Sequence, residues 1–121
     1  MILVLTSEQL RSINMNFVSY HEYPKSYRID ACYSSYLYRE TIEEQITDIV
    51  VKLVKSHYFP DGNKRTAVAV YFLLCKNAHI KCLPDEKVDK AILQIASEHV
   101  IDISDVTFNK YVKLLFPKFE K

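Results

Sequence analysis

The sequence predicts an all-α fold, a compact bundle of five to six helices with at most a short N-terminal strand. Three observations predict it. Apolar residues recur at helical spacing in several segments, helix-capping residues precede most of these segments, and the only strand candidate is a short run at the N-terminus. A chain of 121 residues also fits a single domain over residues 1–121, which is large enough to bury one hydrophobic core.

The first predicted elements are a short extended segment and a helix. Residues 2–5 are apolar and directly precede a helix start, which is typical of a short strand. Thr6 followed by Gln9 matches a capping box, and apolar residues then recur at helical spacing, so a helix is predicted over residues 7–18. Residues 19–29 have a proline in the middle and no apolar period, which predicts an exposed loop.

Two helices are predicted next along the chain. Asp30 is placed to cap a short helix over residues 31–40. The clearest helix follows over residues 41–56, where Thr41 and Glu44 form a capping box. Its apolar residues make one stripe, so this helix is predicted to be amphipathic: Ile42, Ile46, Ile49, Val50, Leu53 and Val54.

The second half of the chain predicts three more helices. Residues 66–79 are apolar nearly all round, which is typical of a helix surrounded by others, so we expect the central core helix here. After a connector, Asp85 is a plausible cap for a helix over residues 86–100. The Ser-Asp pair at 104–105 begins a last helix, which Pro117 ends.

Charge and cysteine content exclude several classes of function. Lys+Arg 16 against Asp+Glu 15 gives a net charge of +1, which creates no field favouring nucleic acid or a membrane surface. The apolar run after Met1 is too short for a signal peptide or a membrane span. The three cysteines include no C-x-x-C pair, which predicts a cytoplasmic protein with Cys32 and Cys75 as small buried residues.

The stretch HYFPDGNKRTAV, residues 57–68, holds the only glycine of the chain between two predicted helices. Its chemistry falls at a helix N-terminus, where unpaired N–H groups and the macrodipole favour an anion. Gly62 permits a left-handed or closely approached backbone that lets N–H groups converge on a phosphate. Lys64 and Arg65 are unfavourable for the helix itself in this turn, a cost that makes sense if an anion sits between them.

Two further residues of the stretch supply chemistry for group transfer. Asp61 offers a hard carboxylate oxygen suited to Mg²⁺, the usual companion of nucleotide phosphates. His57 can accept a proton from a hydroxyl near neutral pH. Singly, each residue also has an ordinary interpretation as a cap, a turn residue or a solvated charge. Together, a base, a metal ligand, an anion-binding turn and two cations favour phosphoryl or nucleotidyl transfer.

At these residues the sequence resembles the Fic/Doc superfamily, whose motif reads HxFx(D/E/N)(G/A)N(K/G)R. Every fixed position is filled from His57 to Arg65, and the predicted helices extend the resemblance over essentially the whole chain. Fic adenylyltransferases usually carry glycine after the asparagine and a second arginine three residues after the first. Here those positions hold Lys64 and Val68, which resemble the Doc (death-on-curing) toxin branch, although glycine at position 62 is the Fic-like choice.

The resemblance implies a role for each motif residue. His57 would be the general base and Asp61 the Mg²⁺ ligand. Gly62, Asn63 and Lys64 would form the anion-binding turn, and Lys64 and Arg65 would neutralise the phosphates. Phe59 would anchor the loop to the core. Lys55 sits where Doc-like proteins can place a basic residue facing the phosphates, and a solvated lysine at a helix end is an equally good interpretation.

For the Doc branch the resemblance implies a toxin that uses ATP to phosphorylate a threonine or serine of a translation factor, EF-Tu, and arrests translation. No glutamate here has Ser or Thr four residues before it, as an inhibitory Fic helix requires, which fits control by a separate antitoxin. Such an antitoxin would place a C-terminal helix in a groove of the bundle.

Three hypotheses stay open: a Doc-like kinase, a Fic-like adenylyl or nucleotidyl transferase, and a helical module that binds an anion or partner without transfer. The tyrosine-rich segment 20–38 is either a recognition surface or the rim of a small core.

Overall fold

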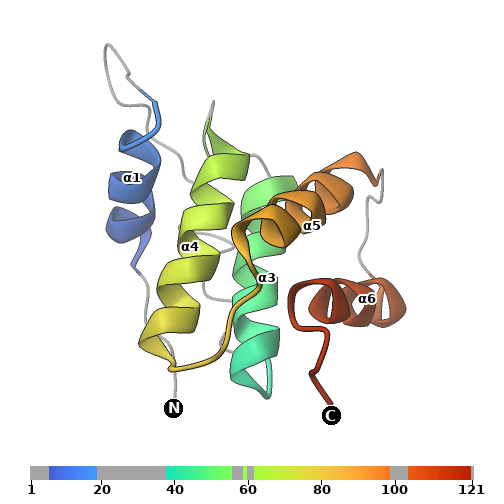
Figure 1. Ribbon diagram of the computed structural model, residues 1–121. Helices are drawn as coiled ribbons and strands as arrows, with labels where there is room; N and C mark the ends of the chain where they lie inside the picture. Colours follow the sequence, from blue (N-terminus) through green and yellow to red (C-terminus); the bar gives the residue numbers. More distant parts are fainter. Residues whose placement is uncertain (1–5, 19–37, 56–58, 60–61, 99–103, 121) are drawn as a thin grey trace.

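Five helices form an all-α bundle in the computed structural model, which describes residues 6–18, 38–55, 59, 62–98 and 104–120 (Figure 1). This confirms the predicted fold class. The helices are α1 (Ser7–Met15), α3 (Ile42–Lys55), α4 (Asn63–Asn77), α5 (Asp85–Ser97) and α6 (Asp105–Leu115). The strand predicted at 2–5, the loop at 19–29 and most of the helix predicted over 31–40 lie outside the described residues.

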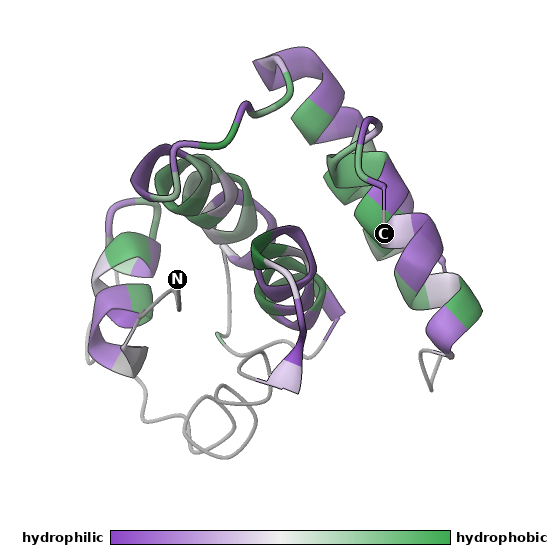
Figure 2. Cartoon of the chain, turned by 90° about the horizontal axis from the view of Figure 1, so that it is seen from below, coloured by the Kyte–Doolittle hydropathy of each residue, from purple (hydrophilic) through white to green (hydrophobic). Residues whose placement is uncertain are grey.

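The helices α3 and α4 form the central pair of the bundle. They lie side by side and run in opposite directions, so the last turn of α3 and the first turn of α4 lie at the same end of the pair (Figure 1). Helix α1 packs on α4, α5 packs on both central helices, and α6 packs on α3 and α5. Viewed from below, α3 and α4 are seen nearly end-on and carry many hydrophobic residues (Figure 2). The turn between α3 and α4 therefore lies at one end of the pair.

Helix α3, and not α4, is the more deeply enclosed helix, which corrects the expectation that residues 66–79 form the central core helix. Every residue from Glu44 to Val51 is buried, whereas the buried residues of α4 lie on part of its circumference. The sequence pattern misled because α3 buries polar side chains as well as its apolar stripe. The physical reason is that most of these polar side chains have partners inside the bundle, as the Thr47 hydroxyl and the Asp48 carboxylate do.

The buried polar groups of α3 are used to cap and brace the helix. The Thr41 hydroxyl accepts from the Glu44 N–H at 3.1 Å while the Glu44 carboxylate accepts from the Thr41 N–H at 3.2 Å, which is the predicted capping box. The buried Asp48 carboxylate lies 3.2 Å from the Lys52 ammonium and 3.8 Å from the Arg39 guanidinium. Arg39 in turn stacks 3.7 Å over the Phe108 ring, so it connects α3 to α6.

The helix boundaries agree with the predictions to within a few residues. Helix α1 begins at the predicted Thr6–Gln9 capping box and ends at Met15, three residues before the predicted end. Helix α6 begins at Asp105 after the N-cap Ser104, whose hydroxyl accepts from the Thr107 N–H at 3.2 Å. Asp85 is the first residue of α5 and Pro84 precedes it as N-cap, so Asp85 is not the cap. An aspartate in the first turn still favours the helix through its dipole.

The C-terminus of α4 shows how this chain turns with so few glycines. His79 has φ 57°, the left-handed conformation that glycine usually supplies after a helix. The Ile80 N–H donates to the Cys75 carbonyl at 2.9 Å and the His79 N–H to the Lys76 carbonyl at 3.2 Å, which is the Schellman pattern. A histidine thus takes the left-handed conformation here, and the single glycine of the chain stands at position 62.

Two further expectations concern the cysteines and membrane association. Cys75 is fully buried, as predicted, and Cys32 lies outside the described residues. Burial raises the pKa of the Cys75 thiol to about 12, so this thiol stays protonated at neutral pH. None of the helices in the described residues is long and apolar enough to cross a bilayer.

Candidate functional site

The turn before α4 depends on the conformation of Gly62. This residue is the N-cap of α4 with φ 76° and ψ 14°, in the left-handed region that the sequence predicted for it. A Cβ atom at this position would lie 2.5 Å from Val18 Cγ2 and 3.0 Å from Asn14 Nδ2. Glycine is therefore required twice, by the backbone angle and by the close approach of the segment that follows α1.

A buried hydrogen-bond chain connects α1 to the same turn. The Asn14 amide donates to the Thr66 hydroxyl at 3.1 Å, and that hydroxyl donates to the Gly62 carbonyl at 2.8 Å. Asn14 and Thr66 are both fully buried. Because buried polar groups without partners are costly, this chain fixes the Gly62 carbonyl and the entry into α4.

Phe59 and Asn63 hold the other side of the turn. Phe59 is 2% exposed and belongs to the hydrophobic core, at the position expected for the loop anchor. The Asn63 amide donates to the Phe59 carbonyl at 2.7 Å, and its oxygen accepts from the Phe59 N–H at 3.1 Å. The Asn63 side chain is thus committed to the loop, so its contribution to anion binding is left to its backbone N–H.

Lys64 and Arg65 occupy the exposed first turn of α4. Neither forms an ion pair with any residue that the structure describes. The first turn contains no acidic residue, and no side chain caps the helix at Gly62. The first N–H groups of a helix lack intrahelical partners, so two cations lie beside these donors, and the first turn of α4 itself supplies no negative charge. Such an arrangement favours an anion.

Lys55, expected to face phosphates or solvent, has a partner elsewhere. Its ammonium donates to the Glu98 carbonyl oxygen at 2.5 Å and lies 5.8 Å from the centroid of the Tyr111 ring. Glu98 is the C-cap of α5, where the negative end of the helix dipole favours a cation. The structure therefore uses the half-buried Lys55 to close the end of α5 against α3.

The Glu98 carboxylate adds a second set of contacts at this end of α5. It accepts from the Lys110 ammonium at 3.1 Å and from the Tyr111 hydroxyl at 3.3 Å. The hydrogen bond from Lys110 holds the pKa of this carboxyl below its usual value. Burial, with Glu98 nearby, raises the pKa of the Tyr111 hydroxyl.

His57 and Asp61, the predicted base and metal ligand, lie outside the described residues, so the two predictions stay predictions. Val68, one turn after Lys64, packs partly buried against the core. The side chain at position 68 is therefore apolar and faces the core, so it adds no positive charge to that of Lys64 and Arg65. The described part of the site is the turn of Phe59 and Gly62 to Arg65.

The comparison with family models agrees with this geometry. The model of the Fic/DOC family matches residues 4–75, which is more than half of the chain. The chain belongs to the Fic/DOC family. The match includes α1, α3, the turn and most of α4, so it contains every element that holds Gly62 in place. Comparison with curated proteins and with solved structures gave no significant match.

Sequence reasoning missed Asn14 and Thr66. Thr66 directly follows the motif and Asn14 lies 52 residues before it, and neither belongs to the motif pattern. One signal was present, because Asn14 is a polar residue between the apolar positions of an amphipathic helix. That signal alone does not name the partner.

Proposed function

We propose that this Fic/DOC chain is a Doc-like toxin of a toxin–antitoxin pair, a protein kinase that transfers the γ-phosphoryl group of ATP to a Ser or Thr hydroxyl of a translation factor such as EF-Tu. One observation carries the proposal. The exposed Lys64 and Arg65 lie in an acid-free first turn of α4 that begins at a left-handed glycine. Such a turn suits a chain of phosphates.

Each residue of the turn has a defined part in the proposed reaction. His57 accepts the proton of the target hydroxyl, whose oxygen forms a bond to the γ-phosphorus as the bond to the β,γ-bridging oxygen breaks and ADP leaves. Lys64, Arg65 and the N–H groups of the first turn of α4 neutralise and orient the phosphates. Asp61 would hold Mg²⁺, which supplies further charge neutralisation when bound.

Two positions favour phosphoryl transfer over the nucleotidyl transfer of Fic enzymes. Lys64 occupies the position where those enzymes usually have glycine, and Val68 the position of their second arginine. The partly buried Val68 offers no charge to an α-phosphate. The alternative of a nucleotidyl transferase rests on Gly62, which is the Fic-like choice. A non-catalytic module that only binds an anion or a partner is the third candidate.

The test follows the label from ATP. The purified chain is incubated with EF-Tu, Mg²⁺ and ATP labelled at either the γ- or the α-phosphate, with His57→Ala as the paired variant. Label from the γ-phosphate that is lost in His57→Ala supports the kinase. Label from the α-phosphate instead supports nucleotidyl transfer, and no label from either position contradicts catalysis on this target.

Growth and gene context test the toxin part of the proposal. Expression of the chain should arrest growth, His57→Ala should not, and circular dichroism should give the same helix content for both. Co-expression of a small neighbouring reading frame should restore growth, because a C-terminal antitoxin helix would occupy a groove of the bundle. Toxicity that survives His57→Ala would contradict a catalytic base.

A further inference from the structure

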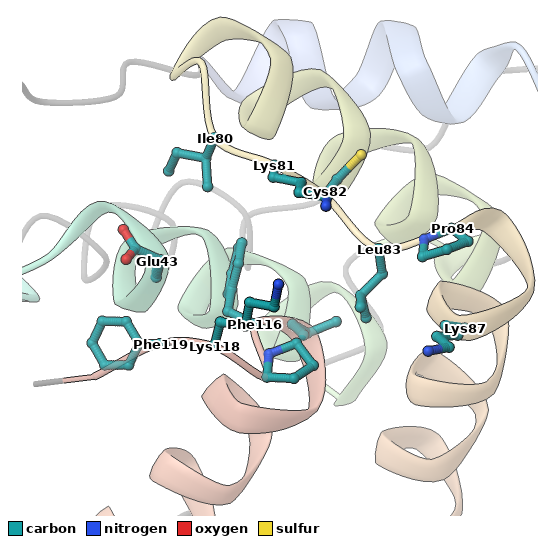
Figure 3. A pocket seen from close by; sticks show the side chains of 12 residues that line it. Glu43, Ile80, Lys81, Cys82, Leu83, Pro84, Lys87, Phe116, Lys118 and Phe119 are labelled. Atoms are coloured by element: carbon teal, nitrogen blue, oxygen red, sulfur yellow. The ribbon is translucent and has the colours of Figure 1, made fainter.

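A pocket of about 470 Å³ lies between the connector that follows α4 and the C-terminal residues that follow α6 (Figure 3). Its apolar surface comes from both of these segments. One wall is formed by Ile80, Cys82, Leu83 and Pro84, and the other by Leu115, Phe116, Pro117 and Phe119. This volume and this mainly apolar lining are typical of sites for small organic molecules.

Hydrogen bonds inside the protein fix the two walls relative to each other. The Tyr71 hydroxyl, on the buried face of α4, donates to the Leu115 carbonyl at 2.8 Å and accepts from the Leu83 N–H at 3.1 Å. Its ring also packs against Phe116 with centroids 5.5 Å apart. Burial raises the pKa of Tyr71 far above its ordinary value, so its hydroxyl stays protonated as a donor. The pocket is therefore preformed by the fold.

Three lysines surround this apolar pocket. Lys81 comes from the connector, Lys87 from the first turns of α5 and Lys118 from the C-terminal segment (Figure 3). None of the three forms an ion pair with any of the described residues. Among the lining residues that the structure describes, Glu43 is the one acidic side chain, and it lies across the pocket from Lys87 in Figure 3, so this part of the lining carries an excess of positive charge.

The pocket is separate from the turn that begins α4. Glu43 belongs to the first turn of α3, whereas the motif follows the last turn of the same helix, so the two sites lie toward opposite ends of α3. Apart from Glu43, all lining residues follow residue 75, where the match to the Fic/DOC family ends. Its ligand is therefore not assigned by membership of the family.

We propose that this pocket binds a small amphiphilic carboxylate, with the apolar body between the two walls and the carboxylate among Lys81, Lys87 and Lys118. The apolar walls remove the body of the ligand from water, and the lysines supply the complementary charge. A neutral apolar molecule would leave the lysines without a counter-charge, and an inorganic anion would leave the walls unused. The inference does not depend on the proposed kinase activity.

The experiment uses decanoate as the probe and amide chemical shifts of the full chain as the readout. Decanoate should cause saturable shifts in the amides of Ile80 to Leu83 and of Phe119, with little change in α1. Lys87→Glu should raise the dissociation constant for decanoate by roughly threefold to tenfold, because it replaces attraction of the carboxylate by repulsion at short range. Lys90→Glu is the matched control, one turn along α5, exposed and outside the lining.

Three results would overturn the proposal. Shifts that do not saturate or that spread evenly over the surface would exclude a defined site. If Lys87→Glu and Lys90→Glu weakened decanoate binding equally, the effect would come from the net charge of the protein and not from a contact in the pocket. If 1-decanol bound as tightly as decanoate, the carboxylate would have no role in binding. Circular dichroism of each variant separates loss of binding from loss of fold.

Discussion

Replacing Gly62 by alanine adds one methyl group where the structure leaves no space for it. The new Cβ would lie 2.5 Å from Val18 Cγ2 and 3.0 Å from Asn14 Nδ2, and the residue would have to keep φ 76°. Asn14 is buried and hydrogen-bonded to Thr66, so it cannot move aside without breaking that bond. The substitution therefore meets both a backbone and a steric obstacle.

The expected cost follows from these two obstacles. Left-handed backbone costs a non-glycine residue about 1–2 kcal/mol, and forcing an extra methyl into a packed site costs about 1–3 kcal/mol. The reduced freedom of alanine in the unfolded chain offsets about 0.4–1 kcal/mol of this. We expect Gly62→Ala to lower the free energy of unfolding by about 1–4 kcal/mol, or the melting temperature by roughly 5–15 °C.

Urea and thermal unfolding followed by circular dichroism measure this loss, and Val18→Ala separates its causes. Removing Val18 Cγ2 relieves the closest contact and leaves the backbone angle unchanged. In a double-mutant cycle the two substitutions should therefore couple favourably by about 1–2 kcal/mol. A Gly62→Ala protein as stable as the wild type, or a cycle with no coupling, would refute the argument. Lys64→Ala, an exposed change in the first turn of α4, is the control for local substitution and should not lower stability, because it removes an unfavourable charge.

Further predictions concern the rest of the bundle. Asn14→Ala should lower stability by about 1–3 kcal/mol in urea unfolding, because it leaves a buried hydroxyl with one partner fewer; the exposed neighbour Met15→Ala should cost much less. His79→Gly should raise stability by about 1 kcal/mol, since glycine adopts the left-handed angle without strain, and a loss would contradict the Schellman assignment. Inorganic phosphate should raise the melting temperature of the wild type more than that of Lys64→Gln, and equal shifts would argue against an anion site at α4. Because the folded pKa of Glu98 is lowered from 4.5, its contribution is present above that pH and is lost as the pH falls below it. The stability difference between wild type and Glu98→Gln should therefore shrink in acid, and a difference that is constant with pH would exclude the ion pair.

The helices could be predicted because their signals are local. Capping boxes at Thr6 and Thr41 and the Ser104 cap each involve residues three apart, and all three are present in the structure. Burial of whole helices could not be predicted in the same way. Helix α3 reads as amphipathic, yet Asp48 is buried because Arg39 and Lys52 approach it in the folded bundle. Which polar side is covered depends on tertiary packing.

The same distinction holds for the site. The left-handed angle of Gly62 could be inferred from its place between two helix signals and from the scarcity of glycine in the chain. The partners of Lys55 and Thr66 could not, because they lie 43 and 52 residues away in the sequence. A lysine at a helix end has the same pattern whether it faces phosphates or the carbonyl of another helix.

The supports of the turn explain how it tolerates two cations at a helix N-terminus. Each of Lys64 and Arg65 costs the helix about 0.3–1 kcal/mol through its dipole, and an unsupported first turn would fray to relieve that cost. Here the Asn63 amide fixes Phe59, and the Asn14–Thr66 chain fixes the Gly62 carbonyl, so fraying would break hydrogen bonds that are buried or partly buried. The repulsion is therefore retained in the folded state, and a bound anion would relieve it. This also explains why glycine stands at position 62: an alanine Cβ would clash with Val18 and with Asn14, and one of the two supports depends on Asn14.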